Sequence, residues 1–293
     1  MKIGIGAVQF GMDYGISNRE GRTPEVEVRN ILDAAAGKGV RLIDTAAGYG
    51  ASEEVLGRAL PPGHAFRVVT KTPGFSGKGI GEHDAEQLEM VFHRSLARLG
   101  QPAVYGLLVH HAEDLLAEGG ERLMGRMEAL KARGLVEKIG VSVYTGEQVD
   151  ALLARYGLDI VQLPLSVLDQ RLLRNGQLAR LKAAGTEIHV RSVFLQGLLL
   201  MAPDELPAYF APIRDHLAAY RACLEREGCE PLKAALDFVL QLDEVDAVIC
   251  GVNNRRQLEE ICRCEAEAPK IRDFRAFALD DPKFLNPANW KIQ

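Results

Sequence analysis

The sequence predicts one α/β domain, residues 1–293, folded as a closed (β/α)8 barrel. Eight short β-branched or aliphatic segments alternate with segments in which apolar residues recur every three or four positions. No Pro-, Gly- or Ser-rich linker divides the chain. Eight continuous apolar strands in a chain of this length fit a closed parallel barrel better than an open sheet.

The alternation assigns each element in order. Residues 2–8, 40–44, 67–71, 104–110, 138–142, 159–164, 187–192 and 247–251 are expected strands. Amphipathic helices are expected over 26–36, 88–99, 123–130, 149–153, 178–184, 232–240 and 258–262. Thr23 is the expected N-cap of the first helix and Pro24 belongs to its first turn, and Ser52 is the expected N-cap of a helix after the second strand. Strand and helix in alternation imply parallel pairing through right-handed crossovers.

One connection departs from this pattern. Residues 196–230 are longer than an ordinary connection between a strand and a helix, and their second half has a helical pattern. We therefore expect an extended loop over the barrel mouth after the seventh strand, with an extra helix.

Composition limits the possible functions. The chain is 47% hydrophobic with a formal net charge of -5, and its Lys and Arg residues are scattered. This argues against a nucleic-acid or membrane partner. We see no targeting segment or membrane span, and the five Cys residues suit neither a disulfide framework nor a metal site. A cytoplasmic protein that acts on a small molecule is expected, and the oligomeric state is left open.

Polar residues at the ends of three expected strands form the candidate catalytic site. Asp44, Lys71 and His110 end the second, third and fourth strands, and Tyr49 follows Asp44 in the next loop. The active site of a parallel barrel lies at the C-terminal ends of its strands, so these four side chains should meet at one rim.

The four residue types suit proton transfer. A phenol with a pKa of about 10 is a poor proton donor unless a nearby cation stabilises the phenolate. Lys71 could supply that cation, Asp44 could hold it, and His110 could orient a substrate oxygen or relay a proton. The set suits protonation of a carbonyl oxygen during hydride reduction. Taken singly, an Asp cap, a solvated Lys and a Tyr lid are the ordinary alternatives. One His and one Asp are too few ligands for a catalytic metal.

The stretch LIDTAAGYGASEEVLGRAL, residues 42–60, resembles the signature of the aldo-keto reductases. The match continues through IGIGAVQFG at 3–11, VTK at 69–71, LLVHH at 107–111, GLVEKIGVS at 134–142, VQLP at 161–164, RSVFLQGLL at 191–199 and GVNNRRQLEEI at 251–261. The resemblance implies an NADPH- or NADH-dependent oxidoreductase on a TIM barrel. It assigns Tyr49 as general acid, tuned by Lys71, with Asp44 pairing Lys71 and His110 orienting the carbonyl.

The resemblance also implies cofactor contacts. Gly6 and Ala7 would approach the nicotinamide, Ser142 and Gln162 would bind its carboxamide, and Arg191 would stack on its ring, with a rim ion pair as the alternative for Arg191. The remaining implied contacts are Ser192, Gly197, Gly251, Asn253, Arg255, Gln257 and Glu260. The last five lie at the adenosine end. Gln257 stands where many members have a phosphate-binding Arg, but the neighbouring Arg255 and Arg256 could replace it, so NADPH is favoured over NADH.

Substrate contacts are expected from the loops, namely Phe10, Met12, Tyr14, Phe75, His111, Tyr144 and residues 198–210. Their mixed character suits an aldehyde, a sugar or a small ketone. Other functions stay open: a cofactor-sensing accessory protein, an NAD-dependent aldose dehydrogenase, or a lyase or isomerase that uses Lys71 as a Schiff base.

Overall fold

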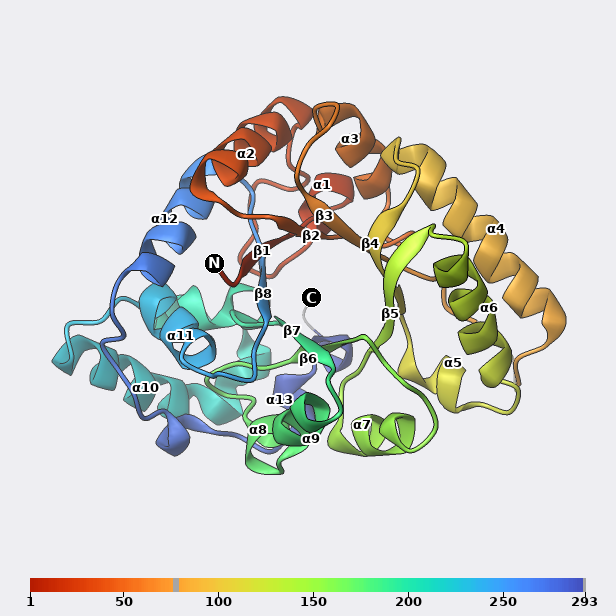
Figure 1. The fold of residues 1–293 in the computed structure, drawn as a ribbon. Coiled ribbons are helices and arrows are strands. Elements are labelled where there is room, and N and C mark those ends of the chain that lie inside the picture. The colour runs from red at the N-terminus through yellow and green to blue at the C-terminus, as the bar shows by residue number, and fades with distance from the viewer. Residues whose placement is uncertain (76–78, 292–293) are drawn as a thin grey trace.

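Eight parallel strands at the centre of the molecule close into a barrel in chain order, with β1 paired to β8 (Figure 1). The computed structural model describes residues 1–75 and 79–291. The strands are β1 Ile3–Gly6, β2 Leu42–Asp44, β3 Arg67–Lys71, β4 Val104–Val109, β5 Val136–Ser142, β6 Ile160–Pro164, β7 Glu187–Arg191 and β8 Ala247–Gly251. The predicted fold class is confirmed.

Helices surround the barrel on the outside, as Figure 1 shows. In chain order the helices are α1 Val8–Gly11, α2 Glu25–Lys38, α3 Ser52–Ala59, α4 Glu82–Leu99, α5 Ala112–Leu116, α6 Glu121–Ala132, α7 Gly146–Leu153, α8 Arg171–Arg174, α9 Gln177–Ala183, α10 Arg214–Arg226, α11 Pro231–Leu240, α12 Arg255–Ala266 and α13 Pro282–Leu285. Their apolar stripes pack inward. In α2, for example, Val28, Ile31 and Leu32 are buried. None of the helices in the described part of the chain is long and apolar enough to cross a membrane.

Three predicted boundaries at the start of the chain are wrong. β1 ends at Gly6, because the backbone turns into α1 at Val8. The N-cap of α2 is Pro24, and no side chain caps that helix. Ser52 is the first residue of α3 and not its cap, because its hydroxyl donates a hydrogen bond to the carbonyl oxygen of Ala7 at 2.7 Å. In the last case a tertiary hydrogen bond replaces the local one that serine usually makes.

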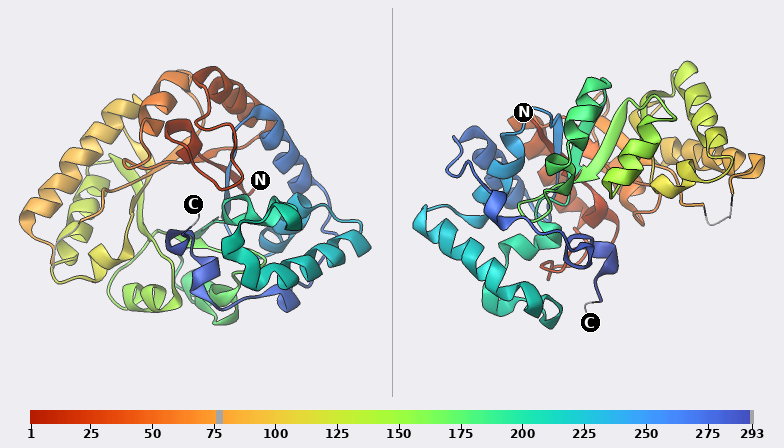
Figure 2. Two further views of the ribbon diagram at one scale, coloured as in Figure 1. Left: turned by 180° about the vertical axis from the view of Figure 1, so that it is seen from behind. Right: turned by 90° about the horizontal axis from the view of Figure 1, so that it is seen from below.

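The predicted extended connection after β7 is present. Three 3-10 helices, Leu195–Leu200, Pro203–Glu205 and Ala208–Ile213, precede the extra helix α10. The segment after β1 lies beside this connection (Figure 2, left), where the hydroxyl of Ser17 donates to the carbonyl oxygen of Gln196 at 3.5 Å. The C-terminal segment packs on the same connection, with the Trp290 ring 4.9 Å from that of Phe210.

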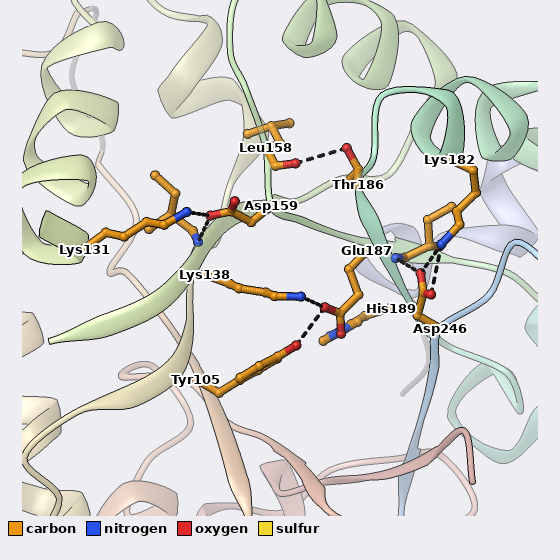
Figure 3. Close-up of polar contacts among 12 residues, drawn as sticks. Tyr105, Lys131, Lys138, Leu158, Asp159, Lys182, Thr186, Glu187, His189 and Asp246 are labelled. Atoms are coloured by element: carbon orange, nitrogen blue, oxygen red, sulfur yellow. Dashed lines mark hydrogen bonds and ion pairs between the residues drawn. The ribbon is translucent and has the colours of Figure 1, made fainter. Parts of the chain in front are cut away.

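A polar cluster fills the barrel at the N-terminal ends of the strands (Figure 3). Glu187 accepts hydrogen bonds from the Tyr105 hydroxyl at 2.7 Å and from the Lys138 ammonium, and Nε2 of His189 lies 2.9 Å from its other oxygen. Burial alone would raise the pKa of Glu187, but the hydrogen bonds of His189, Lys138 and Tyr105 lower it to about 2. This end of a (β/α)8 barrel serves stability, so we treat the cluster as structural.

Candidate active site

A cavity of about 600 Å³ opens at the C-terminal ends of the strands, the end predicted to hold the site. It is lined by most of the predicted site residues: Gly6, Ala7, Asp44, Tyr49, His110, Ser142, Gln162, Arg191, Ser192, Gly197, Gly251, Asn253, Gln257 and Glu260. Lys71 lies directly behind this lining, paired with Asp44. Arg255 does not line the cavity.

Lys71 and Asp44 form a buried ion pair beneath the cavity. The Lys71 ammonium donates to the two carboxylate oxygens of Asp44 at 2.8 and 2.7 Å and to the carbonyl oxygen of Thr45 at 2.9 Å. Burial disfavours the charged form and is the largest single influence, but the charge and hydrogen bonds of Asp44 together with those of Tyr49 outweigh it, so the pKa of Lys71 is raised. Lys71 is therefore a fixed cation.

Two glycines hold Tyr49 over this ion pair. A Cβ atom at Gly11 would lie 1.9 Å from the carbonyl oxygen of Tyr49, and Gly50 has a φ of +56° and faces the Gly11 carbonyl. The N–H of Ala51 donates to that carbonyl at 3.3 Å. The short helix α1 thus packs directly against the turn and places the Tyr49 ring centroid 5.0 Å from the Lys71 ammonium.

His110 completes the group and is neutral. Its ring lies edge-on to the Tyr49 ring, with 5.7 Å between the centroids. Burial lowers its pKa to about 3, and the positive charge of Lys71 acts in the same direction. A neutral imidazole can donate or accept a hydrogen bond near Tyr49 without adding charge.

Gln162 has a contact that sequence reasoning did not foresee. Its amide N–H donates to Asp44 at 2.7 Å, so it helps to hold the carboxylate that holds Lys71. Ser142, at the end of β5, is buried beside the cavity, and Val143 follows it in the core.

Arg191, at the end of β7, lies over an aromatic ring. Its guanidinium carbon is 4.1 Å from the ring centroid of Tyr144, and Nη2 donates to the carbonyl oxygen of Val143 at 3.0 Å. Within the described part of the chain no salt bridge reaches Arg191. The structure therefore gives no support to the alternative rim ion pair. The next residue, Ser192, has a φ of 61°.

The N-terminal turn of α12 forms the far wall. The side chain of Asn254 caps the helix by accepting the N–H of Gln257 at 3.0 Å, and the side chain of Gln257 accepts the N–H of Asn253 at 2.8 Å. Arg255 is ion-paired with Glu259 at 2.7 Å on the exposed face of the helix.

The substrate wall differs from the prediction. Tyr14 and Tyr144 line the cavity, whereas Phe10, Met12, Phe75 and His111 do not. Phe10 is fully buried in the core, because α1 turns its side chain inward. Of the predicted stretch 198–210, Leu200 reaches the cavity. Lining residues that sequence reasoning missed include Gln9, Ser17, Asn18, Gln196 and Glu230. They lie in loops, in helices of only four to six residues or at a helix start, where no periodic signal marks them.

The cavity fits a ligand that carries hydrogen-bond donors. The side-chain carbonyl oxygens of Gln9 and Asn253, two residues of the lining, lack partners among the described residues. At Gly251 a Cβ atom would lie 2.5 Å from the Gln9 amide nitrogen, so the backbone there is approached closely. The size falls within the range of small-molecule and cofactor sites. A dinucleotide, with its amide and hydroxyl groups, suits this donor and acceptor set.

The fold and the site define a (β/α)8-barrel protein with a buried Lys–Asp pair, a phenol and a neutral imidazole at one cavity. The model of the aldo/keto reductase family matches residues 2–276, and the chain belongs to this family. Aldo-keto reductases of Mycolicibacterium paratuberculosis and Mycobacterium avium are each 37% identical to it over 123 residues, 41% of this chain and 40% of theirs.

Solved structures share the fold. The holo form of an aldo-keto reductase from Bacillus halodurans superposes with a TM-score of 0.76 at 20% identity, over 99% of this chain and 94% of that one. Its apo form gives a TM-score of 0.72 at 21% identity, over 99% and 93%.

Proposed function

We propose that this protein is an oxidoreductase that uses a reduced nicotinamide dinucleotide, NADPH or NADH, to convert an aldehyde or ketone, including sugar-derived carbonyls, into the alcohol. The observation that carries the proposal is the position of Tyr49. Its ring lies over a buried cation that Asp44 holds in place and beside an imidazole that stays neutral. A phenol in these surroundings can act as a general acid in one direction of the reaction and as a general base in the other.

Each residue has a stated role in the reduction. The bound nicotinamide supplies the hydride. Tyr49 donates its phenolic proton to the carbonyl oxygen as negative charge develops there, and Lys71 stabilises the charge that the phenol oxygen acquires. Asp44 holds the Lys71 ammonium in place, and Gln162 holds the Asp44 carboxylate. Neutral His110 donates a hydrogen bond that orients the carbonyl. In the oxidation of an alcohol the same proton moves in reverse.

Substitution of the phenol tests this proposal. We expect Tyr49→Phe to lower kcat by about 10² to 10⁴-fold, the usual range for a general acid, with cofactor affinity near wild type. Steady-state oxidation of NADPH and NADH with glyceraldehyde, methylglyoxal and aldoses measures the first quantity, and calorimetric titration measures the second. Tyr105→Phe removes the same atom at the opposite end of the barrel and serves as the control.

Two results would contradict the proposal. Wild-type activity in Tyr49→Phe would remove the phenol from the chemistry. Cofactor binding without turnover of any carbonyl in the panel would favour the cofactor-sensing accessory function instead.

A further inference from the structure

The two ends of the cavity differ in what they offer a ligand. Tyr49 and His110 lie at one end. We call the second end of the cavity the part of its lining that comes from the start of α11 and from α12, which pack together: Glu230, Pro231, Leu232, Gln257, Glu260 and Ile261. If the proposed function holds, the nicotinamide lies beside Tyr49, because the hydride is delivered there. The adenosine half of an extended dinucleotide then lies at the second end.

The second end carries negative charge. The carboxylates of Glu230 and Glu260 line it, and no salt bridge reaches Glu230 within the described part of the chain. Among the described lining residues Arg191 is the one Lys or Arg, and it belongs to the end of β7, against Tyr144. A phosphate group at the second end would therefore meet the carboxylate of Glu230, which has no salt bridge among the described residues, and that of Glu260, which Arg256 pairs from outside the lining.

The two arginines that favoured NADPH in the sequence are held elsewhere. Nε of Arg255 donates to Glu259 at 2.7 Å, and Nε of Arg256 donates to Glu260 at 2.9 Å, both as (i, i+4) pairs along α12. Neither guanidinium lines the cavity. A phosphate would have to compete with Glu260 for Arg256.

The neighbouring Asn253 offers an acceptor. The side chain of Asn18 donates to the carbonyl oxygens of Tyr14 at 3.1 Å and Gly21 at 2.9 Å, so its own oxygen is an acceptor. That oxygen accepts the amide N–H of Asn253 at 3.1 Å, which leaves the Asn253 carbonyl oxygen without a partner among the described residues. A ribose hydroxyl can donate to such an oxygen, whereas a phosphate dianion cannot.

We propose that this end of the cavity selects NADH over NADPH, with Glu230 and Glu260 as the specificity-determining residues. The 2'-phosphate of NADPH brings a charge of about -1.5 to -2 to a wall of carboxylates. The 2'-hydroxyl of NADH donates a hydrogen bond to a carboxylate, as it does at other NAD sites. We expect the dissociation constant of NADPH to exceed that of NADH by about tenfold or more, because like charges at an interface oppose binding.

Calorimetric titration of the full chain with each reduced dinucleotide tests the wild-type preference. NADH binding about tenfold tighter supports the proposal. NADPH binding as tightly or more tightly overturns it and leaves the proposed function standing. Absence of binding by either dinucleotide overturns both.

Variants at the start of α11 and on α12 separate the contributions of Glu230 and Glu260. Glu260→Gln and Glu230→Gln should each improve NADPH affinity relative to NADH by about three- to tenfold, as expected when a repelling charge is removed. Glu259→Gln, which frees Arg255 outside the cavity, is the matched control and should leave the ratio unchanged. The double variant Arg256→Ala/Glu260→Gln should keep the gain. If the gain disappears, the freed Arg256 produced it, and the role of Glu260 is overturned.

Discussion

The ammonium of Lys71 lies within 2.8 Å of both carboxylate oxygens of Asp44, and both side chains are buried. This pair links the stability of the barrel to its chemistry, because the charge that Asp44 holds in place is the charge beneath Tyr49.

Asp44→Asn should lower both the stability of the barrel and the rate of the chemistry at Tyr49. Removal of one partner from a buried pair costs about 3–5 kcal/mol of unfolding free energy. The pKa of Lys71 should fall as well, because the charge of Asp44 is the main influence that raises it. Urea unfolding measures the loss of stability, and single-turnover kinetics measures the effect on the chemical step. Asp237→Asn breaks the buried Lys233–Asp237 pair away from the cavity and should lower stability without changing turnover. An Asp44→Asn enzyme with wild-type kinetics would contradict the link.

His110 should not titrate in the working pH range. Its pKa is about 3 in the folded protein and about 6.5 in an unfolded chain, so between these values the unfolded state binds more protons. The contribution of His110 to stability is therefore present above pH 6.5 and is lost as the pH falls toward 3. From pH 7 to pH 5 the unfolding free energy should fall more for wild type than for His110→Gln. Equal losses would show that the imidazole is not held neutral.

Arg191→Leu should weaken binding of the nicotinamide end of the cofactor. The guanidinium lies over the Tyr144 ring, anchored by the Val143 carbonyl, and belongs to the wall of the cavity. Because such contacts are worth about 0.5–2 kcal/mol, we expect the dissociation constant to rise about two- to thirtyfold. Arg191→Lys should recover little of the lost cofactor affinity, since an ammonium is not planar and cannot stack on a ring. Wild-type cofactor affinity in Arg191→Lys would show that the positive charge alone accounts for the contribution of Arg191.

Glu187→Gln should lower stability and spare catalysis. The carboxylate accepts hydrogen bonds from Tyr105 and Lys138 at the N-terminal ends of the strands, and its loss should cost about 1–3 kcal/mol at neutral pH. Its pKa of about 2 lies below the unfolded value of about 4.3. The stabilisation is thus present above pH 4.3 and disappears as the pH falls toward 2. The difference in unfolding free energy between wild type and variant should narrow over that range; a constant difference would point to packing instead.

Sequence reasoning predicted the barrel and the meeting of Asp44, Tyr49, Lys71 and His110, because strand ends in a parallel barrel share one rim. It missed contacts that depend on tertiary detail. Ser52 has the chemistry of a helix cap but bonds to Ala7, across 45 residues of chain. Phe10 has the chemistry of a pocket wall but is turned inward by a helix of four residues. Such short elements form because their neighbours pack against them, and local pattern does not encode that.

Arg255 shows a second limit. Proximity in sequence placed it near the adenosine end, but its partner one helical turn later, Glu259, draws the side chain along the outside of α12. The ion-pair partner of such a side chain depends on distances of a few ångströms, and the sequence does not specify these.

The turn after β7 has a thermodynamic consequence for ligand binding. Ser192, Leu195 and Gln196 all have positive φ, a conformation that costs about 1–3 kcal/mol for a residue other than glycine. Hydrogen bonds from the Ser17 hydroxyl to the carbonyl oxygen of Gln196 and from the N–H of Leu195 to the carbonyl oxygen of Ser192 hold that conformation, so contacts within the protein shape this part of the cavity. A ligand that contacts Ser192 and Gln196 loses little chain entropy in ordering them, and more of its contact energy appears as affinity.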